Sequence, residues 1–219
     1  MGNTGHRRKR ILLTGSCEYE LQGLSLLLAG MGYEAVREEA SPPGACDFIL
    51  VALSAEPLAG WGRHLQGIRM LYAANPVPVV VLVPERLKGM RLLRGTAQVI
   101  SGRAGLESLR SLLRLAFETP PEPDLSGELT RLRLQTLLSM LRAINSNESL
   151  TVTSHKDYYP RTRLVEYVGV PNLHVLCVSG LLSGVITDDP DSFINRRDTV
   201  TRISASGSPL TSRGDRRTK

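Results

Sequence analysis

The chain has 219 residues, of which 42% are hydrophobic and 5% aromatic. This length gives room for two modest domains, or for one domain with tails. The formal net charge of +6 favours an anionic partner, although basic residues at both ends of the chain contribute to it. The low aromatic content argues against an aromatic base-stacking platform as the main binding device.

The cysteines and the hydropathy pattern exclude two further classes. Cys17, Cys46 and Cys177 are odd in number and widely spaced, which fits neither a zinc site nor a disulfide framework. We therefore expect a reduced chain. No apolar run reaches the roughly 18 residues that a membrane span requires, so we expect no membrane partner.

The first 118 residues carry the signals of an α/β domain. Residues 10–15 form a short apolar run that ends in glycine, which is typical of a buried parallel strand. Leucines at helical intervals then predict a helix over residues 17–32, with Gly32 as its C-cap. The remaining strands are predicted at 34–37, 47–53, 77–83 and 97–100, and the remaining helices at 61–74 and 106–117. We count a fivefold alternation of strand and helix, which predicts a doubly wound parallel sheet of five strands.

The second half has a different pattern. Residues 120–127 are rich in turn formers and acids, which is typical of a linker, and leucines at helical spacing resume over 129–144. From residue 187 onward the chain is polar and charged. We therefore expect a basic disordered tail (1–9), an α/β domain (10–118), a linker (119–127), a small all-α domain (128–187) and a polar disordered tail (188–219).

The α/β domain resembles the receiver domain of response regulators, because its predicted strands end near residues 15, 52, 83 and 101. The resemblance implies a magnesium-binding acidic pair after the first strand and a phosphoacceptor Asp after the third. It also implies a hydroxyl after the fourth strand and a Lys after the fifth. The corresponding positions here are Gly15 with Ser16, Ala52, Val83 and Ser101.

None of the charged groups of that site is present, so we expect a pseudo-receiver that is not phosphorylated. Its expected role is to dimerise or to dock onto a partner regulator. The nearest acids are Glu18, Glu20 and Glu56. We expect them to be solvated loop carboxylates rather than a substitute metal site.

The second half resembles the DNA-binding domain of LuxR/FixJ-type regulators, a helix-turn-helix. The resemblance rests on the order of four motifs: Leu129-Thr130, Asn147-Glu148, Thr153-Ser154-His155-Lys156 and Val168-Gly169-Val170. The segment 171–182 then corresponds to the fourth helix of that family. Together with the receiver-like front, the chain is similar to the Rcs-type auxiliary regulators, which pair with a partner regulator.

The resemblance implies that the window 151–176 contains the recognition helix. The candidate DNA-binding residues are Ser154, His155, Lys156, Tyr158, Tyr159, Arg161 and Arg163. Helical spacing places Lys156, Tyr159 and Arg163 on one face. Leu164, Val165 and Val168 can then pack inward, and Thr153 or Ser154 can cap the helix.

Two departures from the family pattern leave an alternative open. The scaffold helix before Leu150 is about three residues short, and Pro160 falls in the middle of the proposed recognition helix. An interior proline costs a helix about 3 kcal/mol relative to alanine. Either the helix begins at Tyr158 or Tyr159, or it is kinked.

These patterns predict a phosphorylation-independent, DNA-binding transcriptional regulator in the cytoplasm, associated with the nucleoid. Its expected partners are double-stranded DNA and either a second copy of itself or a related response regulator. The alternative is an interaction module that does not bind DNA and modulates a partner regulator. A small α/β enzyme is a third option, but no catalytic constellation and no Gly-rich phosphate loop is present. We therefore expect no catalytic residue, no cofactor and no metal.

Overall fold

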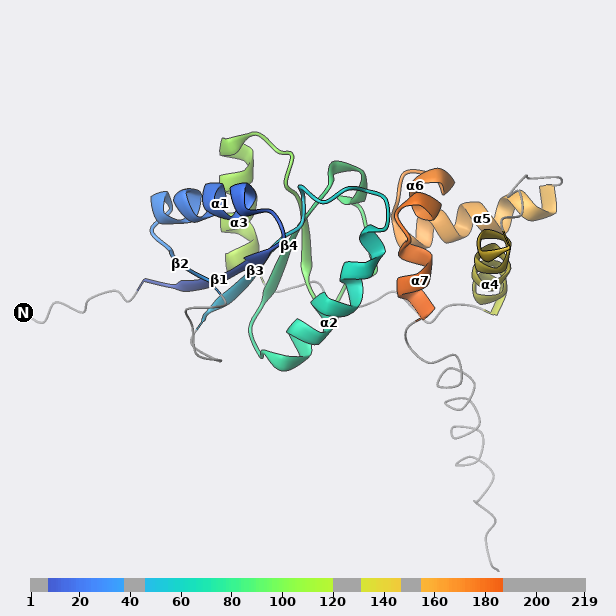
Figure 1. Cartoon of the computed structure of the whole chain (residues 1–219), viewed down its shortest axis with the longest axis horizontal. Helices are drawn as coiled ribbons and strands as arrows, with labels where there is room; N and C mark the ends of the chain where they lie inside the picture. Colours follow the sequence, from blue (N-terminus) through green and yellow to red (C-terminus); the bar gives the residue numbers. More distant parts are fainter. Residues whose placement is uncertain (1–7, 38–45, 120–130, 147–154, 187–219) are drawn as a thin grey trace, which may run out of the picture. The chain divides into compact units, whose positions relative to one another are not determined.

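The computed structural model describes residues 8–37, 46–119, 131–146 and 155–186 (Figure 1). Its first part is a wholly parallel five-stranded sheet in the order β2-β1-β3-β4-β5. The strands are β1 (Arg10–Gly15), β2 (Glu34–Arg37), β3 (Phe48–Ala52), β4 (Val79–Val83) and β5 (Gln98–Ser101). The predicted receiver-like sheet is confirmed, and all five strands lie within two residues of their expected bounds.

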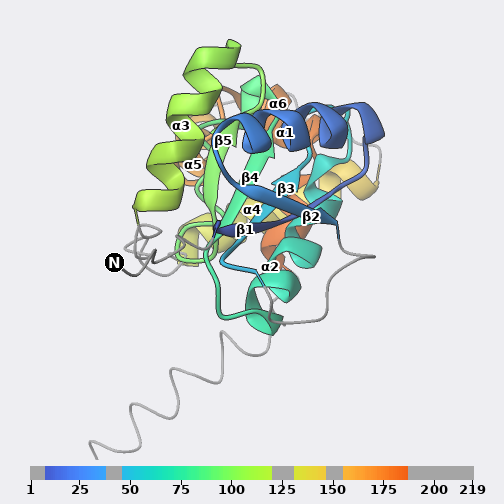
Figure 2. The same cartoon turned by 90° about the vertical axis from the view of Figure 1, so that its left-hand side faces the viewer.

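Three α-helices cover this sheet on its two faces. Figure 2 shows α1 (Glu18–Gly30) and α3 (Leu106–Glu118) on one face and α2 (His64–Ala74) on the other. Successive side chains of a strand point to opposite faces, so Phe48 and Leu50 join the core under α1 and α3. Ile49 and Val51, their neighbours in β3, are also buried, as expected of a strand covered on both sides.

One expectation for the sheet is wrong. The connection between β4 and β5 contains no α-helix, only the 3-10 turn η3 (Glu85–Leu87), so strand and helix do not alternate five times. Two glycines explain the irregular path. Gly95 has a left-handed φ of 73°, and a Cβ on Gly89 would press against the Gly169 carbonyl oxygen. The residues between β2 and β3, from 38 to 45, lie outside the described ranges.

Helix bounds follow local capping. Gly32 has a φ of 88° and closes α1 as predicted, with the Tyr33 amide donating to the Leu28 carbonyl at 3.0 Å. The predicted helix at 61–74 instead begins as the 3-10 turn η2 (Trp61–Arg63) and becomes α-helical at His64.

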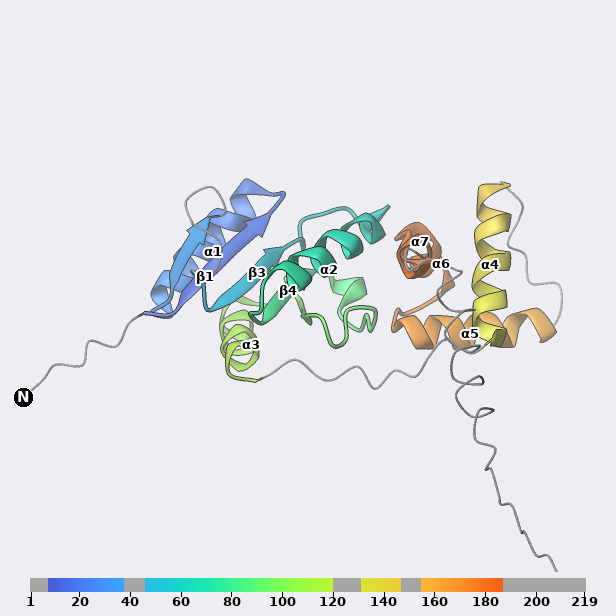
Figure 3. The ribbon, with the colours of Figure 1, turned by 90° about the horizontal axis from the view of Figure 1, so that it is seen from below.

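The second part consists of four helices: α4 (Arg131–Asn145), α5 (His155–Val168), α6 (Leu173–Val178) and α7 (Leu181–Ile186). Helix α4 contacts α5, which it crosses in Figure 3, and α5 contacts α6. The expected single helix over 171–182 is wrong. Gly180 has a φ of 68° and separates α6 from α7, a left-handed conformation that favours glycine. Asn172 begins α6 by accepting a hydrogen bond from the Val175 amide at 2.9 Å.

Main-chain hydrogen bonds join these helices to loops of the α/β part. The amides of Gly60 and Gly62 donate to the carbonyls of Val178 and Ser179 at 3.0 and 2.7 Å. A Cβ on Gly62 would collide with the backbone of Gly180, so the two chain segments meet as bare backbone. All these residues belong to one compact unit that ends at Val185.

The remaining expectations for the ends and the linker fall largely on other residues. The tails at 1–9 and 188–219 and the linker at 119–127 lie outside the described ranges, except for Arg8, Lys9 and Thr119. In the described ranges no helix combines the length and the apolar character that crossing a membrane requires.

Candidate functional site

The carboxyl ends of the strands meet at one edge of the sheet. Strand register pairs Gly15 with Ala52 and Val83 with Ser101. The strand order turns between β1 and β3, and open parallel sheets bind their ligands at such a switch point. Ala52 and Val83 are fully buried here. The side chains of Ala52 and Val83 carry no polar atom at these two strand ends.

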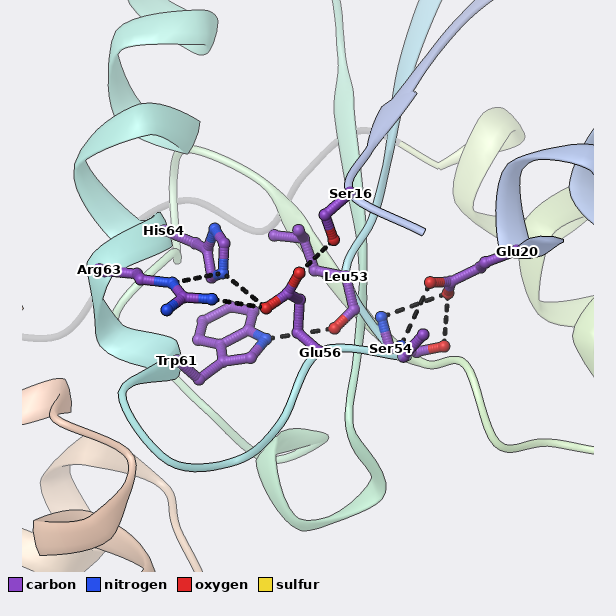
Figure 4. Close-up of polar contacts among 9 residues, drawn as sticks. Ser16, Glu20, Leu53, Ser54, Glu56, Trp61, Arg63 and His64 are labelled. Carbon is purple, nitrogen blue, oxygen red and sulfur yellow. Dashed lines mark hydrogen bonds and ion pairs between the residues drawn. The ribbon is translucent and has the colours of Figure 1, made fainter. Parts of the chain in front are cut away.

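Polar groups at this edge come from the flanking segments instead. The Glu20 carboxylate, on α1, accepts hydrogen bonds from the main-chain amides of Ser54 and Ala55, both at 3.2 Å. It also accepts one from the Ser54 hydroxyl (Figure 4). Ser54 is only 8% exposed, so its hydroxyl needs a partner inside the protein, and Glu20 supplies it.

A second carboxylate lies on the same loop. Glu56, whose side chain is 12% exposed, accepts hydrogen bonds from the Ser16 hydroxyl and from Arg63 at 2.7 Å (Figure 4). The Ser16 hydroxyl, with Arg63 adding to its effect, holds the pKa of Glu56 below its ordinary value. His64 Nε2 lies 3.5 Å from the Glu56 carboxylate and 3.3 Å from Arg63 Nε, so all three side chains meet at one point.

The expectation of solvated loop carboxylates is wrong for Glu20 and Glu56, because both have several donors inside the protein. Glu18, two residues earlier on α1, instead pairs with Arg37 of β2 at 2.6 Å in an exposed position. Arg37 lowers the pKa of Glu18. Ser54, a hydroxyl placed shortly after an apolar strand, is the sequence signal for this cluster.

Helix α5 carries the candidate DNA-binding residues. It begins at His155, and Pro160 lies inside it. Of the two alternatives for Pro160, the later start at Tyr158 or Tyr159 is therefore wrong. Proline has no N–H, so the helix loses the bond to the Lys156 carbonyl. The Thr162 hydroxyl donates to the Tyr158 carbonyl at 3.1 Å in the same turn.

The two faces of α5 differ as predicted. Tyr158 and Tyr159 are 57% and 58% exposed, and Arg163 is exposed as well. Leu164, Val165 and Val168 are buried on the inner face. Among the candidates, these three exposed side chains share the outer surface.

The other candidates are placed differently. Arg161 is half-buried near Cys177, where its charge partly offsets the effect of burial, which raises the pKa of that thiol. His155 and Lys156 form the first turn of α5, and their side chains are outside the described part. Ser154 lies outside the described residues altogether.

The Arg163 guanidinium has partners within its own helix. Its Nε donates to the Tyr159 hydroxyl at 3.1 Å, and Nη1 donates to Glu166 at 2.9 Å. The guanidinium also lies over the Tyr159 ring, 5.2 Å from its centroid. These contacts are exposed to water, where ion pairs are weak, so a phosphate can compete for the same donors.

The described residues include no group of three or more His, Cys, Asp or Glu side chains that could hold a metal ion. The two carboxylates at the sheet edge are each engaged by protein donors. The arrangement can therefore hold a loop in place.

No family model and no curated protein matches this chain. Among solved structures, it is similar to RcsB from Salmonella enterica serovar Typhimurium bound to a promoter. The TM-score is 0.51 at 12% identity, covering 81% of this chain and 99% of RcsB.

Two further solved structures match with lower scores. Full-length FixJ from B. japonicum has a TM-score of 0.32 at 13% identity, covering 81% of this chain and 98% of FixJ. The receiver domain of a sensor histidine kinase from Pseudomonas aeruginosa has a TM-score of 0.35 at 16% identity, covering 51% of this chain and 99% of that domain. Scores this low carry no argument. At 12% identity the likeness to RcsB establishes the fold alone, so the chain has a receiver-like parallel sheet followed by a small group of helices.

Proposed function

We propose that the protein is a DNA-binding transcriptional regulator that acts without phosphorylation. It works as a homodimer or as the auxiliary partner of a related response regulator, in the cytoplasm at the nucleoid. The observation that carries this proposal is helix α5. One face of this helix is apolar and buried, and the other presents Tyr158, Tyr159 and Arg163 to solvent.

The chemistry of this outer face suits a nucleic-acid backbone. Tyrosine hydroxyls and lysine commonly hold phosphates, whereas arginine also reads guanine in the major groove. Lys156 lies in the first turn of α5, at helical spacing from Tyr159 and Arg163. The net charge of +6 adds a general attraction to an anionic polymer.

The end of β3 supports the proposal of phosphorylation independence. Ala52 stands where a receiver carries its phosphoacceptor, and a methyl group cannot accept a phosphoryl group. We further propose the division into an α/β domain (10–118), a linker (119–127) and a helical domain (128–187). Dimerisation would then set two α5 helices about one turn of DNA apart.

The test is the double substitution Lys156→Ala with Arg163→Ala. We expect weaker binding to duplex DNA and a shallower salt dependence, with the slope falling by roughly 0.9 for each phosphate that the variant no longer neutralises. Fluorescence anisotropy over about 50–200 mM salt measures both quantities. Footprinting with and without a related response regulator then locates the site.

The matched control is Arg110→Ala. It also removes a partly exposed cation from a helix, but this arginine lies on α3 and pairs with Glu107. Affinity and slope should stay at the wild-type values in the control. An α5 double variant that binds DNA as the wild type does would refute the assignment of α5.

One observation favours a second candidate, an interaction module that modulates a partner regulator without binding DNA. Pro160 interrupts the hydrogen bonding of α5, and Arg163 is engaged by Tyr159 and Glu166. Capture of a related response regulator, combined with no DNA affinity alone or in that complex, would select this candidate over the first.

A further inference from the structure

The edge of the sheet where a ligand would be expected is occupied by the chain's own carboxylate. Two consecutive amides, those of Ser54 and Ala55, point at Glu20 from the end of β3. The buried Ser54 hydroxyl points at the same carboxylate. Consecutive main-chain amides aimed at one point form an anion-binding concavity. This one lies at the switch point of the strand order, next to the β1–β3 pair.

We propose that Glu20 is a built-in anion. Its carboxylate fills the oxyanion position after β3 and holds residues 53–63 in the shape that binds the α6–α7 backbone, so no added group is needed. This deepens the proposed function, because it rests on phosphorylation independence and supplies a physical reason for it beyond the missing Asp.

The loop after β5 lies close to Glu20 and Ser54. A Cβ on Gly102 would collide with the Ser54 hydroxyl, so the loop after β5 approaches as bare backbone. The same Cβ would lie 3.6 Å from Glu20 Oε1, which is ordinary van der Waals contact. Glu20 already engages the two amides and the hydroxyl, so an external oxyanion would have to compete with it for these donors.

The held loop also contacts the helices. Trp61 is fully buried and its Nε1 donates to the Leu53 carbonyl at 3.3 Å, which ties the far end of the loop to its start. Gly60 and Gly62, on either side of Trp61, donate their amides to the carbonyls of Val178 and Ser179. The Glu20 contact at the start of the loop and the helix contact at its end thus share one short segment.

A simpler explanation is that Glu20 only favours the start of α1, since acids in the first turn stabilise a helix. Glu18 separates the two explanations, because it lies in the same first turn but pairs with Arg37 instead of the loop. Glu18→Gln removes the same favourable charge from α1 and leaves the loop contacts in place. It is the matched control.

The experiment is amide hydrogen exchange on the full chain, comparing wild type with Glu20→Ala, Glu20→Gln and Glu18→Gln. Hydrogen bonds to a charged group are strong, so we expect exchange at Ser54 and Ala55 to rise roughly 10- to 100-fold in both Glu20 variants. Exchange at Gly60 and Gly62 should rise with it, and Glu18→Gln should match the wild type at all four amides. Glu20→Gln keeps the volume of the side chain, so it serves if Glu20→Ala does not fold.

Sodium formate and sodium acetate then test whether the position is an oxyanion site. In Glu20→Ala, either anion should restore protection at Ser54 and Ala55 in a saturable way, and sodium chloride at equal ionic strength should not. Unchanged exchange in both Glu20 variants would overturn the proposal. The proposal would also be overturned if formate slowed exchange at Ser54 and Ala55 in the wild type as much as in Glu20→Ala. Exchange in Glu18→Gln as fast as in Glu20→Gln would overturn it too. None of these readouts involves DNA, so loss of the proposed regulator function would leave this result intact, and the reverse also holds.

Discussion

The loop after β3 and helix α5 both carry charged residues, but they use them in opposite ways. In the loop, Glu56 is 12% exposed and engaged by Ser16 and Arg63. Glu20, which reaches the loop from α1, is engaged by two of its amides and a hydroxyl. In α5, the Arg163 side chain is 51% exposed, and its partners lie within the same helix. The difference teaches that charge alone does not mark a binding surface. A charged group satisfied from several segments holds the fold, whereas one satisfied only within its own helix stays available to an outside partner.

The substitution with the largest expected effect breaks the contact between the loop after β3 and helices α6 and α7. Gly62→Val places a side chain against the Gly180 backbone, and we expect a loss of about 3 kcal/mol in the free energy of unfolding. Urea denaturation measures the loss, and amide exchange over residues 173–183 should locate it.

The control for this change is Gly67→Ala in α2, where an added Cβ meets no atom within 4 Å. That change should be neutral or stabilising by about 0.5–1 kcal/mol, because alanine favours a helix interior. Equal stabilities for Gly62→Val and the wild type would show that the main-chain contact does not exist in solution.

A smaller effect is expected from Pro160→Ala, which restores regular hydrogen bonding in α5. Alanine restores the missing N–H in α5, so we expect this helix to gain about 1–3 kcal/mol against local opening. Amide exchange from Tyr158 to Arg163 measures the gain. Pro171→Ala, at an exposed position between α5 and α6, is the control and should leave exchange in α5 unchanged. Faster exchange in Pro160→Ala than in the wild type would contradict the described hydrogen bonding.

The smallest expected effect is a pH dependence of the stability that Glu56 provides in the loop after β3. The folded-state pKa of Glu56 is lowered, chiefly by the Ser16 hydroxyl. The stabilisation is therefore full above the unfolded-state pKa of about 4.3 and is lost as the pH falls through the folded-state value. We expect Glu56→Gln to lower the Tm by about 2–4 °C at pH 7, with the difference closing in acid.

Thermal melts between pH 3 and pH 7 test this, with Glu107→Gln as the control. Glu107 is exposed and bonded to Arg110 within α3. If the difference in Tm between the wild type and Glu56→Gln grew as the pH fell, the described role of Glu56 would be excluded.

Strand positions were predictable because their signal is local. The apolar run ending at Val83 is buried on both faces, and the run ending at Gly15 alternates buried and half-buried residues, which leaves little freedom in their placement. The inner face of α5, from Leu164 to Val168, was predictable for the same reason, since helical spacing decides which side chains pack. The path of the segment between β4 and β5 was not, because Gly89 meets Gly169 about 80 residues later in the chain.

The sequence by itself determined the sheet, its strand ends and the amphipathic character of α5, because hydrophobic periodicity and glycine caps act over a few residues. Only the tertiary structure decided what the acids do. Glu18 and Glu20 are two residues apart on one helix, yet one pairs with an exposed arginine and the other with the amides after β3. That choice depends on which distant backbone groups lack partners once the sheet has assembled, and no local pattern records it.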